Sequence, residues 1–69
     1  MLPAITYNGH PVQIVQVWPT RNVTGEPLLT IRSLNTDREW EVWEFELEGD
    51  YSVIKKDVEK VERRRALRR

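Results

Sequence analysis

The chain contains no cysteine and no apolar run longer than two residues. Without cysteine it forms neither a disulfide nor a cysteine-ligated zinc site. Runs as short as Ile14-Val15 and Leu28-Leu29 exclude a membrane-spanning helix, which needs about 20 mostly apolar residues. The N-terminus carries neither a basic stretch nor an apolar one, so we expect no secretory signal and a cytoplasmic location.

Histidine and glycine are scarce, which argues against a metal site and against a phosphate-binding loop. The single histidine, His10, has no ligand pattern around it, which indicates a solvated turn residue rather than a metal site. The three glycines each suit a turn and form no phosphate-binding loop. Glu44, Glu46 and Glu48 alternate with apolar residues, as on a solvated strand face. We therefore predict no catalytic residue, no metal and no cofactor.

The charges are balanced in number but uneven along the chain. The 69 residues allow one domain with a small core and have a net charge of zero. Residues 37–50 hold seven acidic side chains and one basic side chain, a net of −6, whereas residues 55–69 have a net of +5. Two interpretations are open: the halves attract each other within the fold, or each attracts a different partner.

Turn signals divide the first part of the chain into short β-type segments. Asn8-Gly9 predicts a hairpin, because both residues tolerate the positive φ of a type I′ turn. Residues 12–18 are β-branched and aromatic, and a slip in their alternation predicts a bulge or a strand covered on both faces. Residues 19–27 are predicted as a loop, residues 28–34 as a second strand and residues 35–37 as a turn.

The alternation in residues 39–48 changes phase between Val42 and Trp43. This change predicts a bulge, or a strand that ends near Val42 and is followed by a short turn of helix. Trp40 and Trp43 cannot share a face of a regular strand. Either one of them is partly exposed and available to a partner, or both are buried through the phase change.

In the C-terminal part of the chain the spacing of apolar residues changes from that of a strand to that of a helix. Residues 51–54 are predicted as another short strand. Ile54, Val58 and Val61 are spaced as on one face of a helix. A final strand over residues 58–62 is the competing prediction.

Five short strands with tight turns point to a small barrel or a strongly bent sheet. The pattern resembles the SH3-like small barrels in Tyr7-Asn8-Gly9-His10-Pro11-Val12, in the long loop before residues 28–32, and in Trp40-Glu41-Val42 leading to residues 45–48. The resemblance covers roughly residues 4–55. It implies a five-stranded barrel over residues 1–56 and a short basic C-terminal helix or tail over residues 57–69. The expected core consists of Val12, Ile14, Leu29, Ile31, Trp40, Val42 and Val53.

Members of this fold mostly bind peptides, nucleic acids or other subunits, and the fold alone does not decide which. The candidate binding residues are two tryptophans and the C-terminal arginines: Trp40, Trp43, Arg63, Arg64, Arg65, Arg68 and Arg69. The arginines can neutralise phosphates, or they are solvated, or they pair with the acidic face. We predict a non-enzymatic protein-interaction module that binds a protein partner or self-associates, with a small nucleic-acid-binding protein as the alternative. Neither a membrane partner nor a small-molecule substrate is indicated.

Overall fold

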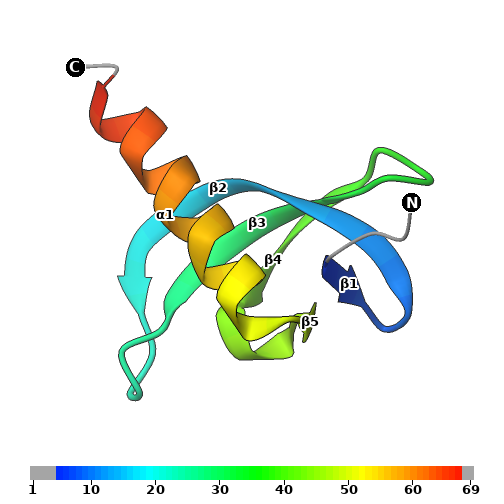
Figure 1. Ribbon diagram of the computed structural model, residues 1–69, viewed down its shortest axis with the longest axis horizontal. Helices are drawn as coiled ribbons and strands as arrows, with labels where there is room; N and C mark the ends of the chain where they lie inside the picture. The colour runs from blue at the N-terminus through cyan, green and yellow to red at the C-terminus, as the bar shows by residue number, and fades with distance from the viewer. Residues whose placement is uncertain (1–4, 68–69) are drawn as a thin grey trace.

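A computed structural model describes residues 5–67, including the side chains of residues 5–64. Five antiparallel strands form one sheet in the order β4-β3-β2-β1-β5, and a C-terminal helix lies against β2 (Figure 1). The elements are β1 (Ile5–Tyr7), β2 (His10–Arg21), β3 (Pro27–Ser33), β4 (Glu39–Trp43), the 3₁₀ turn η1 (Glu44–Glu46), β5 (Glu48–Gly49) and α1 (Tyr51–Leu67).

The sheet is open, with β4 and β5 as its two outer strands. The predicted mainly β fold is confirmed, but the closed SH3-like barrel is not. β5 has only two residues, and both pair with β1 through Ile5↔Gly49 and Thr6↔Glu48. The chain then enters α1, so too little strand follows to reach β4 and close the sheet.

The turn and the irregularity predicted in the N-terminal half are confirmed. Asn8 and Gly9 have φ values of 50° and 79°, and they join β1 to β2 in a tight hairpin. The register of β2 against β3 shifts between Ile14 and Gln16, which is the bulge that the slip in alternation predicts. β2 continues to Arg21, so the connection to β3 is shorter than the predicted loop.

The phase change after Val42 corresponds to the start of η1. The carboxylate of Glu46 accepts a hydrogen bond from the backbone N–H of Trp43 at 2.7 Å and so ties the two ends of this turn together. The turn directs Glu44 inward, where it is 2% exposed, and leaves Phe45 on the surface. The prediction that Glu44 lies on a solvated face is therefore wrong, because this segment is not a strand.

Helix α1 begins where a strand was predicted. Asp50 Oδ1 accepts hydrogen bonds from the backbone N–H of Ser52 at 2.9 Å and from its hydroxyl at 2.7 Å. The Asp50 carbonyl accepts the N–H of Ile54, so Asp50 caps the helix. The two bonds from Ser52 lower the pKa of Asp50 and keep the cap charged. The predicted strands over residues 51–54 and 58–62 are both wrong, and the helical spacing is confirmed.

The core lies between the sheet and α1. Val12, Ile14, Leu29, Ile31 and Val42 are buried as predicted. Trp40 and Val53 lie at the margin of the core and are only partly buried. Among the described residues, five more are buried in the core: Ile5, Val17, Leu47, Ile54 and Val58. The last two come from α1, which replaces the missing wall of the barrel.

Candidate functional site

Aromatic side chains gather where η1, the first turns of α1 and the β2–β3 turn meet. They line a hollow of about 680 Å³, which we call the aromatic groove. Its walls are the β2–β3 turn (residues 22–26), Trp43, Phe45, Tyr51 and Lys55. Because η1 follows β4 directly and α1 starts four residues after Leu47, three short segments bring these rings together.

The groove holds most of the exposed large apolar side chains in the described part of the chain. Four such side chains are exposed: Val23, Leu34, Phe45 and Tyr51. Three of them line the groove, and only Leu34 lies outside it. Phe45 is 65% exposed and Tyr51 is 64% exposed, although burial of rings this large is strongly favourable. An exposed apolar cluster of this kind is typical of an interaction site.

The β2–β3 turn is a preformed wall of the groove. Asn22 Oδ1 accepts the backbone N–H groups of Thr24 and Glu26, both at 3.0 Å. The N–H of Gly25 returns to the carbonyl of Asn22 at 3.0 Å, and its φ of 85° explains why glycine stands there. These bonds present Val23 at the tip of the turn, with its side chain in solvent.

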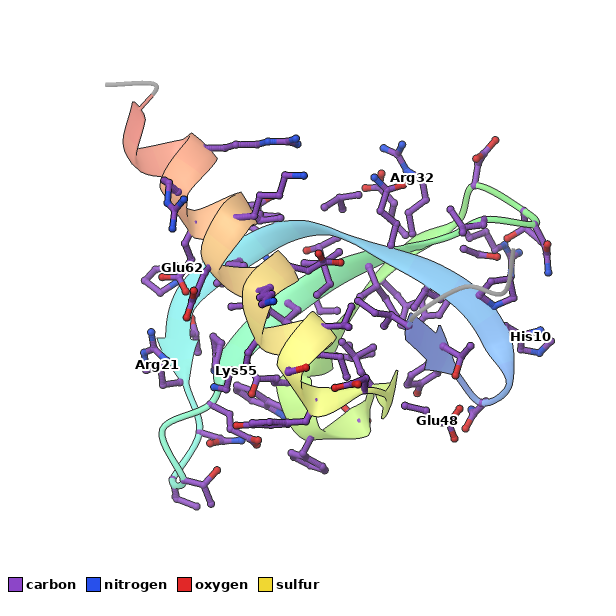
Figure 2. The ribbon with its side chains drawn as sticks, in the orientation of Figure 1. His10, Arg21, Arg32, Glu48, Lys55 and Glu62 are labelled. Atoms are coloured by element: carbon purple, nitrogen blue, oxygen red, sulfur yellow. The ribbon has the colours of Figure 1, made fainter. Side chains whose placement is uncertain are left out.

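Lys55 places a fixed positive charge in the groove. Its Nζ lies 3.1 Å from Oε1 of the buried Glu44 and 5.5 Å from the centre of the Tyr51 ring. The contacts with Glu44 and then with Tyr51 raise the pKa of Lys55. Neither carboxylate oxygen of Glu44 has a well-oriented hydrogen bond among the described residues, so Lys55 is the group that compensates the charge of this carboxylate. Figure 2 shows Lys55 on the side of α1 that faces the β2–β3 turn.

The two predicted tryptophans lie in different places. Trp43 lines the aromatic groove and is half-buried. Trp40 is also half-buried, but it packs edge-on against Tyr7, with 5.6 Å between ring centres and 67° between ring planes. It lines a second hollow beside His10 and the β3–β4 turn. The structure therefore gives the two tryptophans separate surroundings.

The predicted arginines lie toward the C-terminal end of α1. Arg63 and Arg64 are exposed, on a part of the helix that projects past β2 (Figure 1). The side chain of Arg65 and the whole of Arg68 and Arg69 lie outside the described residues. Among the described residues, the ion pairs are Arg32–Glu39 and Lys55–Glu44, so Arg63 and Arg64 do not pair with the acidic segment 37–50.

Of the residues that give the groove its apolar and charged character, four were not predicted as binding residues from the sequence: Val23, Phe45, Tyr51 and Lys55. The available signal was the phase change after Val42, since a turn at that point can direct Phe45 outward while Glu44 turns inward. Tyr51 was assigned to a strand, and nothing local to it predicts exposure. No group of three or more potential metal ligands (His, Cys, Asp or Glu) occurs among residues 5–67.

No family model matches this chain, and neither a curated protein nor a solved structure matches it significantly. Within the described range, no helix is both long enough and apolar enough to cross a membrane. The function is therefore inferred from the chemistry of the surface.

Proposed function

We propose that this chain is a non-enzymatic protein-interaction module, and that its aromatic groove binds the same groove of a second copy. One observation carries the proposal: three of the four exposed large apolar side chains in the described part of the chain line this groove. Aromatic residues are enriched at the centres of interfaces, where they act as anchors.

We infer a second copy as the occupant because the same aromatic side chains can face each other about a two-fold axis. A two-fold arrangement brings Phe45 of each copy against Tyr51 of the other, so one contact is made twice. Glu46 and Asp50, which adjoin Phe45 and Tyr51 in the sequence, then lie near Lys55 of the partner. The net charge of zero leaves little long-range repulsion between copies.

The first test measures self-association by sedimentation equilibrium across micromolar to millimolar concentrations. We expect a monomer–dimer equilibrium that Phe45→Ala weakens at least tenfold, equivalent to about 1.4 kcal/mol, because the dimer loses the ring on both sides. Tyr51→Ala should act in the same direction. Added salt should change the equilibrium less, since exposed ion pairs contribute only about 0–1 kcal/mol.

Leu34→Ala is the matched control, because Leu34 is also exposed but lies outside the groove. It should leave the dimerisation constant unchanged. An equal loss in Leu34→Ala and Phe45→Ala would show non-specific apolar contact. A wild-type chain that stays monomeric throughout would exclude the second copy and leave a partner of different sequence as the occupant.

The exposed arginines of α1 favour a second candidate function, the binding of nucleic acid. Arg63 and Arg64 are exposed, and among the described residues neither forms an ion pair with the acidic segment. If they neutralise phosphates, the affinity for duplex DNA falls with salt, and the Arg63→Ala/Arg64→Ala variant lowers the slope of log K against log salt by about two. An unchanged slope would exclude these two arginines as phosphate contacts.

A further inference from the structure

A second hollow of about 760 Å³ lies beside the β3–β4 turn, and we call it the turn pocket. It is lined by Trp40, by residues of the turn 33–38, and by His10 at the start of β2. It shares no residue with the aromatic groove. Figure 2 shows His10 at one end of the molecule, well away from Lys55.

The frame of the turn pocket is fixed by backbone hydrogen bonds. The Ser33 hydroxyl accepts the N–H groups of Asn35 at 3.2 Å and Thr36 at 3.3 Å, while the Ser33 N–H donates to the Arg38 carbonyl at 2.8 Å. The N–H of Leu34 donates to the carbonyl of Pro11 at 3.0 Å, which attaches the turn to the start of β2. A ligand therefore meets side chains on a frame that is already ordered.

Three polar side chains at this pocket have no partner among the described residues: the imidazole of His10, the amide of Asn35 and the guanidinium of Arg38. The acid that lines the pocket, Glu39, is engaged instead. Its Oε2 accepts hydrogen bonds from Nε of Arg32 at 2.9 Å and from Nη2 at 2.6 Å. The groups free to bind a ligand are therefore mainly donors, and one of them is permanently charged.

Trp40 supplies an aromatic wall for the same pocket. Its indole is held in place by the edge-on contact with Tyr7, and it is only half-buried. A purely apolar ligand would strip water from Arg38 and Asn35 without replacing their hydrogen bonds, which is costly. The pocket therefore suits a ligand that combines a flat ring with an anionic group and further acceptors.

We propose that the turn pocket binds a nucleotide unit, either within a single strand or as a free nucleotide. The base packs against Trp40, since base–aromatic stacking is sequence-tolerant and contributes about 1–3 kcal/mol per base. The phosphate accepts charge-assisted hydrogen bonds from Arg38, with His10 at its side. The Asn35 amide, which also lines the pocket, contacts the edge of the base. This site is separate from both the aromatic groove and the arginines of α1.

The test is a titration of the ¹⁵N-labelled chain followed by backbone amide shifts, with two probes. One probe is an oligothymidylate of about eight nucleotides and the other is thymidine monophosphate. We expect saturable shifts at His10 and in the turn 33–38. Arg38→Ala should weaken binding at least fivefold and lower the salt slope by about one. Tighter binding of the oligomer than of the monophosphate identifies a strand, and equal binding identifies a free nucleotide.

Two further variants separate the pocket from general charge. Lys56→Ala removes one exposed positive charge on α1 and should leave the affinity within twofold. Trp40→Leu keeps an apolar side chain against Tyr7 but removes the stacking surface, and it should weaken binding while the unfolding midpoint confirms that it folds. The proposal is overturned if neither probe shifts the pocket, if the shifts occur only at residues 60–64, or if Lys56→Ala weakens binding as much as Arg38→Ala.

Discussion

Replacing Ile31 with alanine is expected to lower the free energy of unfolding by about 2–5 kcal/mol. Ile31 is fully buried in β3, which lies between β2 and β4 in the sheet. It pairs with Ile14 on one side and with Trp40 on the other, so truncating its side chain leaves a cavity in the middle of the core. Protein domains have unfolding free energies of only about 5–15 kcal/mol, and small domains lie toward the lower end, so this loss is a large share of the total stability.

Chemical denaturation measures the effect of Ile31→Ala, and Val23→Ala is its control. Val23 is also β-branched but stands in solvent at the tip of the β2–β3 turn, so its truncation should change stability by no more than about 0.5 kcal/mol. Equal unfolding midpoints for Ile31→Ala and the wild type would contradict the burial of Ile31.

Replacing Lys55 with methionine is expected to destabilise the fold by about 3 kcal/mol, because it leaves the buried Glu44 carboxylate without an opposite charge. Glu44→Met should cost less, since the ammonium of Lys55 is partly exposed and can turn to water. The double variant Glu44→Met/Lys55→Met removes both charges, and we expect it to regain most of the loss. Chemical denaturation of the four proteins gives the coupling free energy.

The same pair predicts how stability depends on alkaline pH. Contact with Glu44 raises the pKa of Lys55 above that of a free lysine, about 10.4. A raised folded-state pKa contributes stability that is fully present below about pH 10.4 and is lost as the pH rises through the folded value. The stability difference between wild type and Lys55→Met should therefore shrink in that range. Lys55 would not compensate the charge of Glu44 if this difference in unfolding free energy stayed constant with pH. The same conclusion would follow if Lys55→Met did not change stability at all.

Local signals in the sequence were sufficient for the hairpin and the bulge. Asn8-Gly9 determines its own backbone conformation, and the slip after Ile14 follows from the side-chain alternation alone. The phase change after Val42 indicated either a bulge or a short turn of helix, and the structure has the turn η1 there. Val12, Ile14, Leu29 and Ile31 could be assigned to the core because each is an apolar member of a strand pattern.

Closure of the barrel could not be predicted, because it depends on a competition around Asp50. The β-branched pair Val53-Ile54 favours a strand, whereas the Asp50 cap on Ser52 favours a helix, and the cap prevails when Ile54 can pack into the core from α1. The aromatic groove could not be predicted for the same reason, since it depends on contacts between separate elements. Burial of Glu44 requires Lys55 from another element, and exposure of Phe45 follows only from that burial.

Because the sheet is open, the acidic residues of β4 lie on an exposed edge, where they affect aggregation. Each outer strand of a sheet is a template on which a further strand can polymerise, which is a route to aggregation. β4 meets solvent with the exposed residues Glu39 and Glu41, and β5 is only two residues long. Glu39 is paired with Arg32, but Glu41 has no ion pair among the described residues, so its charge opposes the stacking of one β4 on another. β5 is too short to template a strand. The exposed charge on β4 and the shortness of β5 therefore both disfavour fibril growth from the edges of this open sheet.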